Sequence, residues 1–302
     1  GADLLGEAVA AYRAALRVIT EAEHPVHWAM ILQNLGIALA EQGERTTGPK
    51  GADLLVEAVA AHRAALRVIT EAEHPVHWAL TLRNLANALT VQGHRTAGAE
   101  GAGRLGEAVA AYHAALRVFT ETDQPVQWAA TMHDLGRALR TQGSRTDGQA
   151  GADLLAEAVA ACRDALRVRT EADYPLGWAT TMQNLAGALG LKGERTAEPE
   201  GPHLLGEAVV ACHAALRVHT EADHPVAWAT TMQYLGNALR TQGERTAGAA
   251  GVDLLGEAVA AFRAALRVFT EADHPVNWAM TRKNMAIAEQ ARADHDTCAD
   301  PR

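Results

Sequence analysis

The sequence predicts an all-α solenoid, and three observations lead to this fold class. The 302 residues divide into six consecutive blocks of 50 residues with two left over, and blocks 1–50 and 51–100 agree at 37 of 50 positions without a gap. A fixed period of this length is typical of a repeat array rather than of one globular core. Apolar residues recur at helical spacing in both halves of each block. Aromatic residues make up only 4% of the chain, and the abundant alanine favours closely packed helices.

We expect a single solenoid domain covering residues 1–302 and built from six two-helix repeats. The last repeat should carry a C-terminal cap and tail, because Glu289 replaces the leucine found at Leu39 and at the equivalent positions of the other blocks. The predicted repeats are 1–50, 51–100, 101–150, 151–200, 201–250 and 251–302.

The first half of each block predicts a helix of about twenty residues, since its apolar residues recur at intervals of one and three. Proline is favoured in a first helical turn, and Pro202 is the second residue of block 5. We therefore expect this helix to begin just after the first glycine of the block and to end near the twenty-second residue. Its apolar residues in block 1 are Leu5, Ala8, Val9, Tyr12, Ala15, Leu16 and Ile19.

The second helix of each block should begin at the position of Pro25 and end at Gly43, because glycine commonly follows the last helical turn. Only two or three residues would then separate the helices of one block, which predicts a tight antiparallel hairpin. The connection to the next block should be longer and polar. Small residues recur at the positions of Gly6 and Gly36, and we expect helix backbones to cross closely there.

Two short patterns give the chain a resemblance to the tetratricopeptide repeat (TPR) family. The first is Leu35, Gly36, Leu39 and Gly43, and the second is Ala8, Tyr12, Ala15 and Leu16. The stretch from His74 to Leu85 is similar to the kinesin-light-chain type of this family. The resemblance implies a right-handed TPR-like solenoid in which the usual unit of about 34 residues is enlarged. It also implies that the chain begins on the family's second-type helix, and we expect the chain to be a fragment of a longer protein.

Composition and charge exclude several classes of protein. The net charge of −9 is unfavourable for binding nucleic acid or an anionic membrane surface. No apolar run approaches the length of a membrane span. Cys162 and Cys212 lie one period apart, too far for a disulfide if they occupy adjacent repeats, so we expect reduced structural thiols, with Cys298 inert in a polar tail. We expect a cytoplasmic protein.

No motif in the chain predicts catalysis, a cofactor or a metal site. His24 and His27 have the spacing of two metal ligands, and His74 and His77 repeat it, but no nearby cysteine or paired carboxylate completes a set of four. There is no nucleophile with a matching base and no glycine-rich phosphate loop after a strand. We therefore expect a protein that is not an enzyme.

Several large or charged residues recur at the same place in the blocks and are predicted to hold the repeats together. Trp28 and its equivalents lie on the apolar ridge, so we expect them to be largely buried; the alternative is a tryptophan ladder that stacks a ligand. The charged or polar positions Glu7, Arg17, Glu21, Arg45 and Thr46 are predicted to form salt bridges and loop-to-helix hydrogen bonds between repeats.

The informative variation lies on one face of the second helix, at block positions 30, 33, 37 and 40. The resemblance implies that this face, with the asparagines of position 34 beside it, lines a concave groove for an extended peptide or a partner helix. The alternative is drift on an unconstrained surface. The candidate partner-binding residues are Gln33, Asn34, Arg83, Asn84, Asn87, His133, Arg137, Arg140, Gln183, Asn184, Gln233, Asn237, Arg240, Lys283 and Asn284.

We therefore expect a protein-interaction scaffold. Arg83, Arg137, Arg140 and Arg240 predict a groove that prefers an acidic segment or a free carboxylate. Joint replacement of the first three should weaken binding with little change in stability. Two other functions are open: the sensor or regulatory arm of a larger signalling protein, and an architectural module that self-associates. In the first helix Leu4, Ala8, Ala11 and Ala15 should be exposed and could mediate homo-association.

Overall fold

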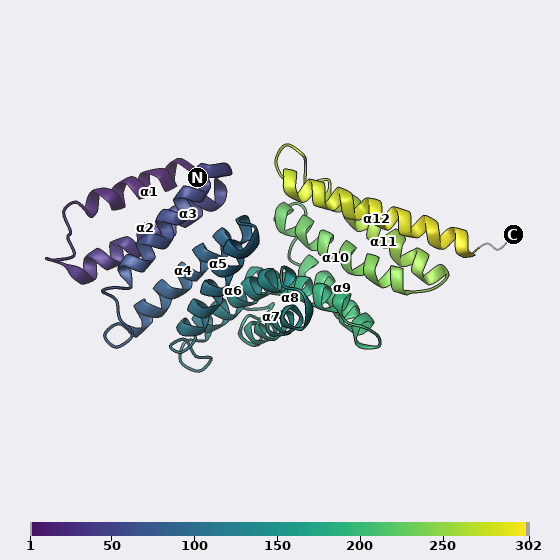
Figure 1. Ribbon diagram of the computed structural model, residues 1–302, viewed down its shortest axis with the longest axis horizontal. Helices are drawn as coiled ribbons and strands as arrows, with labels where there is room; N and C mark the ends of the chain where they lie inside the picture. The colour runs from purple at the N-terminus through teal and green to yellow at the C-terminus, as the bar shows by residue number, and fades with distance from the viewer. Residues whose placement is uncertain (1, 300–302) are drawn as a thin grey trace. The chain divides into compact units, whose positions relative to one another are not determined.

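The computed structural model describes residues 2–299 of the chain, with side chains over residues 4–295, and in this range it contains twelve α-helices and no strand (Figure 1). The chain divides into two compact units, Gly1–Arg145 and Thr146–Arg302, which we call unit 1 and unit 2. Unit 1 contains α1 (Ala2–Ala15), α2 (Pro25–Arg45), α3 (Gly48–Ala65), α4 (Pro75–Arg95), α5 (Gly98–Ala115) and α6 (Pro125–Ser144). Unit 2 contains α7 (Gly148–Val168), α8 (Pro175–Arg195), α9 (Glu200–Leu216), α10 (Pro225–Arg245), α11 (Ala249–Ala265) and α12 (Pro275–Ala299).

Within each unit every helix packs against the next one along the chain, as a solenoid requires. The even-numbered helices also touch one another in order: α4 contacts α2 and α6 in unit 1, and α10 contacts α8 and α12 in unit 2. In Figure 1 the helices of unit 1 lie side by side in chain order. The prediction of an all-helical repeat architecture is therefore confirmed.

The tight hairpins join different blocks from those predicted. An even-numbered helix begins at its proline, as expected, but α2 runs past Gly43 to Arg45, and only two residues separate it from α3. The odd-numbered helices from α3 onward begin before the first glycine of the block, and most odd-numbered helices end seven residues earlier than predicted. Nine residues then separate α1 from α2. The predicted hairpin inside each block is thus wrong, and the close pairs are α2 with α3, α4 with α5, α8 with α9, and α10 with α11.

The nine-residue connections are turns built from local hydrogen bonds, although their apolar spacing imitates a helix. The amides of Arg67 and Val68 bond to carbonyls three residues earlier, and then the hydroxyl of Thr70 accepts a bond from the amide of Glu73 at 3.3 Å. Ile69, inside this turn, is buried. The apolar positions therefore continue past the helix end because the turn itself packs against the core.

In each hairpin the two backbones cross closely at two glycines, one at position 43 of a block and one at position 1 of the next block. A Cβ added to Gly51 would lie 2.0 Å from the carbonyl oxygen of Thr46, and one added to Gly43 would lie 3.1 Å from the carbonyl oxygen of Gly51. Gly43 is therefore not a helix stop but a point where α3 approaches α2. The same arrangement recurs at Gly93 with Gly101, Gly193 with Gly201, and Gly243 with Gly251.

No helix backbones cross among the described residues at block positions 6 and 36, where close crossings were predicted. A Cβ on Gly6 would meet only the side-chain amide of Gln42, at 3.9 Å, so no neighbour requires glycine there. A Cβ on Gly36 would lie 2.5 Å from the ring of His62, and one on Gly236 would lie 2.7 Å from the ring of Phe262. Position 36 therefore makes room for a ring from the following helix rather than for a backbone.

The repeated charged residues link neighbouring blocks, which confirms their predicted role. Arg67 forms an ion pair with Glu21 at 3.0 Å and stacks over Trp28, with its Cζ atom 5.7 Å from the ring centroid. The indoles are half-buried, so the prediction that they are largely buried is wrong, and the guanidinium of Arg67 covers one face of the Trp28 ring. The same triplets are Arg117 with Glu71 and Trp78, Arg217 with Glu171 and Trp178, and Arg267 with Glu221 and Trp228.

A second link binds the arginine of position 45 to the end of the previous even-numbered helix. In unit 1 the Nη1 of Arg145 donates to the carbonyl oxygens of Gly93, at 2.6 Å, and Thr96, at 3.0 Å. Its Nη2 donates to the carbonyl oxygen of His94 at 2.5 Å. These carbonyls lie where an α-helix has no partners of its own.

We expect Arg145→Met to lower the free energy of unfolding by about 1–2 kcal/mol, because charged hydrogen bonds to three carbonyls are lost and the exposed position softens the effect. Arg145→Lys should recover only part of the loss, since an ammonium lacks the planar fork. Urea denaturation followed by circular dichroism measures both. The control is Arg63→Met, which breaks the exposed ion pair with Glu107 and should cost much less.

The two ends of the helix array differ as predicted. Leu4 is 68% exposed, and Ala8, Ala11 and Ala15 are more exposed than their equivalents in later blocks, which are buried. Homo-association through this face stays a prediction. At the other end α12 supplies partners from within the last block, because Arg282 stacks on Trp278 and Glu289 pairs with Arg263 at 2.9 Å. Glu289, Gln290, Arg292 and Asp294 are exposed, as expected.

The cysteine prediction is confirmed where the structure describes it. Cys162 and Cys212 are fully buried thiols. Burial raises the pKa of the Cys212 thiol to about 12, so it remains protonated at neutral pH. The side chain of Cys298 lies outside the described residues.

Candidate functional site

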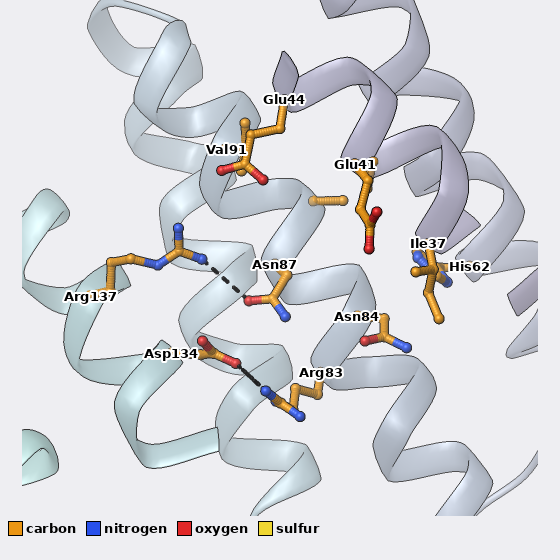
Figure 2. Close-up of a pocket in the computed structure, with 12 residues that line it drawn as sticks. Ile37, Glu41, Glu44, His62, Arg83, Asn84, Asn87, Val91, Asp134 and Arg137 are labelled. Carbon is orange, nitrogen blue, oxygen red and sulfur yellow. Dashed lines mark hydrogen bonds and ion pairs between the residues drawn. The ribbon is translucent and has the colours of Figure 1, made fainter. Parts of the chain in front are cut away.

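A polar pocket in unit 1 is the clearest candidate site, and three successive even-numbered helices build it (Figure 2). Its volume is about 300 Å³, at the small end of the range for ligand pockets. We call it the α2–α4–α6 pocket. Its lining residues are Ile37, Ala40, Glu41 and Glu44 from α2, His62 from α3, Arg83, Asn84, Asn87, Ala88 and Val91 from α4, and Asp134 and Arg137 from α6.

This pocket brings together four of the predicted binding residues, namely Arg83, Asn84, Asn87 and Arg137. All four are half-buried. They come from block positions 33, 34 and 37, so the variable face of the second helix does line a hollow here. The partner-binding role of these residues stays a prediction.

The other predicted residues are placed elsewhere, and several serve the array itself. Gln183 donates to the hydroxyl of Thr231 at 3.0 Å, and Gln233 donates to that of Thr281 at 2.9 Å, so position 33 joins neighbouring even-numbered helices. Asn284 donates to Asn237 at 2.9 Å. Gln33, His133 and Asn184 are buried, Arg140 and Arg240 are half-buried, Lys283 is exposed, and Asn34 is exposed and lines a separate hollow with Met30.

Arg83 and Asp134 form a largely buried ion pair across α4 and α6. The Nε and Nη2 atoms of Arg83 both lie 2.8 Å from Oδ2 of Asp134. Burial by itself would raise the pKa of Asp134, but the charges of Arg83, His133 and Arg137 more than offset it and hold the pKa below its usual value. Asp134 is therefore ionised, and Arg83 is committed to it.

Arg137 is held by a second polar cluster between the same helices. Its Nη2 lies 3.4 Å from Oδ1 of Asn87, which also accepts a 2.7 Å bond from the buried hydroxyl of Tyr112. Burial works against the charge of Arg137, but Tyr112, Asp134 and Glu44 raise its pKa. Figure 2 shows Arg137 and Asp134 approaching Asn87 and Arg83 from the α6 side.

His62 differs from every other polar residue in the pocket wall. Its side chain has no exposed surface, and neither ring nitrogen has a hydrogen-bond partner among the described residues. At the equivalent position the hydroxyl of Tyr112 finds Asn87, and Phe262 has no polar atom to satisfy. Burial lowers the pKa of His62 from 6.5 to about 4, so the ring is neutral at pH 7.

We expect His62→Phe to raise the free energy of unfolding at pH 7 by about 1–2 kcal/mol, because an unsatisfied buried polar group is removed. The gain should grow as the pH falls from 6.5 toward 4. In that interval the unfolded chain binds a proton at His62 and the folded chain does not, so the wild type loses stability that the phenylalanine variant keeps. Urea midpoints across this pH range measure the difference. A constant difference between the two proteins would contradict the neutral buried ring.

The pocket is not the basic surface that was expected to bind an acidic partner. Glu41 and Glu44 are exposed, and their carboxylates form no hydrogen bond or ion pair among the described residues. With Asp134 they give three carboxylates against two guanidiniums, so the lining carries a net charge of −1 with His62 neutral. In unit 2, Arg240 is likewise neutralised, by Glu244 at 2.6 Å and Glu194 at 3.6 Å.

Sequence reasoning missed Glu41, Glu44 and His62. The first two could have been found, because positions 41 and 44 continue the face of position 37 by steps of four and three. His62 stands where Tyr12, Tyr112 and Phe262 stand, so the repeat pattern indicates a packing residue. Only the three-dimensional structure shows that its nitrogens are unpaired.

Other kinds of site are not formed by the residues that the structure describes. No three histidine, cysteine, aspartate or glutamate side chains among them gather in a way that could hold a metal ion. None of the described helices combines the length and the apolar character needed to cross a bilayer. Comparison with protein-family models and with curated protein sequences finds no match to this chain.

Proposed function

We propose that this protein is a non-enzymatic protein-interaction scaffold. In this proposal it is a right-handed TPR-like solenoid of six two-helix repeats, and its even-numbered helices form a groove for an extended peptide or a partner helix. The observation that carries the proposal is the α2–α4–α6 pocket, where polar side chains from three successive even-numbered helices converge. Solenoids typically bind extended partners along such surfaces.

The contrast between the repeated packing residues and the variable pocket residues supports the proposal. Packing and stacking use the alanines, leucines, tryptophans and repeated charged pairs, which recur from block to block. The pocket residues vary instead: position 37 reads Ile37, Asn87 and Arg137 along the three helices of unit 1. A surface built for one partner needs such variation, whereas the architecture of the array does not.

A site-specific crosslink tests the proposal. Peptides selected from a random display library on the intact protein would be offered to two variants that carry a photoreactive phenylalanine analogue. One replaces Ile37 in the pocket, and the control replaces the exposed Ala60 on α3. We expect crosslinks from position 37 only. Selected peptides that crosslink equally well from position 60, or a library that yields no binder, would count against a groove-binding scaffold.

A further inference from the structure

The α2–α4–α6 pocket carries an inference about the chemistry of the partner, and this inference rests on the proposed scaffold function. We propose that the pocket receives a positively charged side chain of the partner, an arginine or a lysine, with Glu41 and Glu44 as its counter-charges. The partner segment at this point would therefore be basic rather than acidic.

The charges inside the pocket favour a cation. Both guanidiniums already have partners, since Arg83 is bound by Asp134 at 2.8 Å and Arg137 is bonded to Asn87. The carboxylates of Glu41 and Glu44 form no hydrogen bond or ion pair among the described residues, although the charge of Glu44 contributes to the raised pKa of Arg137. Figure 2 shows both carboxylates on the α2 side of the pocket, opposite Arg137. An incoming anion would meet this uncompensated negative wall.

In unit 2 an arginine of the protein itself occupies the position that corresponds to this pocket. There Arg240 of α10 bridges Glu194 of the preceding even-numbered helix and Glu244 of its own helix. In unit 1 the residue equivalent to Glu194 is Glu44, but Thr90 stands where Arg240 stands. The hydroxyl of Thr90 bonds to the carbonyl oxygen of Ala86 at 2.8 Å and supplies no charge.

A ligand cation would therefore take the place that an internal guanidinium takes in unit 2. The residue equivalent to Glu244 is His94, which cannot serve as a second counter-charge. Glu41 can, because it lies one helical turn before Glu44 on the same helix. At the position of Glu41 the other blocks have Val91, Thr141, Leu191, Thr241 and Ala291, so this pair of carboxylates is particular to unit 1.

His62 is an independent sign that the pocket is incomplete without a ligand. Its ring is fully buried, lines the pocket and has no hydrogen-bond partner, and such groups are rare in folded proteins. In Figure 2 the ring lies behind the side chain of Ile37, which is partly exposed. A donor N–H that displaces the side chain of Ile37 would reach the acceptor nitrogen of the neutral ring. The nearby amide of Asn84 has no bond among the described residues and is free to accept a second donor.

The test uses fluorescently labelled pools of nine-residue peptides with random flanks. The central residue is fixed as arginine, lysine, leucine or glutamate, and binding to the intact protein is followed by anisotropy. We expect the arginine and lysine pools to bind at least tenfold more tightly than the leucine pool, and the glutamate pool to bind most weakly. The preference should fade as salt is raised, because the carboxylates are exposed.

Two pairs of substitutions distinguish an effect of the pocket carboxylates from an effect of the overall negative charge. Glu41→Gln with Glu44→Gln should abolish the preference for a basic centre while leaving the melting curve unchanged. Glu23→Gln with Glu73→Gln removes the same charge from two exposed connections and should keep the preference. A leucine or glutamate preference, or a basic preference that survives the pocket substitutions, would overturn this inference while the scaffold function stands. No binding by any pool would overturn both.

Discussion

Alanine at Gly101 should destabilise unit 1 by about 3 kcal/mol, because its Cβ would lie 2.0 Å from the carbonyl oxygen of Thr96 and 3.0 Å from that of Gly93. Both obstacles are backbone atoms, so no side chain can rotate away. The loss should appear as a lower urea midpoint of the helical circular dichroism signal. Hydrogen exchange should quicken first in α4 and α5, since a solenoid repeat depends mainly on its neighbours.

The same helix contains its own control. A Cβ added to Gly103 meets nothing within 4 Å, and this glycine lies in the helical interior of α5. Gly103→Ala should therefore raise stability by up to about 1 kcal/mol, through helix propensity alone. If the two alanine variants were equally stable, the close crossing of α4 and α5 at Gly101 would be wrong.

These two glycines show why the fold could be predicted only in part. The class, the repeat length and the helix starts at Pro25 and its equivalents follow from local signals. The pairing of helices does not, because a glycine in an apolar pattern can end a helix or admit a neighbouring backbone. The local sequence pattern around the glycine is the same whether the helix ends there or a neighbouring backbone crosses it. If Gly43 ends the helix, the tight turn falls in the wrong half of the block.

The apolar residues of the connections had the same effect. Leu16 and Ile19 continue the helical spacing, but the chain turns after Ala15. Periodicity reports which side chains face the core, and residues of a packed turn satisfy that condition as well as residues of a helix. The missing information is the hydrogen bonding of the turn, in which the hydroxyl of Thr20 accepts a bond from the amide of Glu23.

The sequence predicts which face of the helix carries the candidate site, but not which side chains contact one another there. Positions 33, 34 and 37 were assigned to one side of the helix from their spacing, and Asn84, Asn87 and Arg137 do line one pocket. Which charge meets which depends on the register between α4 and α6. Arg83 and Asp134 are 51 residues apart, and nothing in one helix alone specifies that they meet.

Because they do meet, Arg83 is not the exposed charge on which the expectation of little change in stability for the joint replacement of Arg83, Arg137 and Arg140 depends. We expect Arg83→Gln to lower the free energy of unfolding at neutral pH by about 3 kcal/mol. Asp134 is only 8% exposed, and removing one partner of a buried pair leaves an uncompensated charge. The loss should shrink as the pH falls, because Asp134 freed from Arg83 would bind a proton more readily and then needs no counter-charge.

The decisive comparison is the double variant Arg83→Gln with Asp134→Asn, which reproduces the residues Gln233 and Asn284 at the equivalent positions of α10 and α12. Gln183 donates to the hydroxyl of Thr231, and Thr131 offers the equivalent hydroxyl to a glutamine at position 83. The double variant should therefore regain most of the stability lost by Arg83→Gln, and its urea midpoint should lose the part of the pH dependence that comes from Asp134. If instead the double variant were as unstable as the single one, the cost would come from the packing of the arginine stem. The ion pair would then not be what holds α4 to α6.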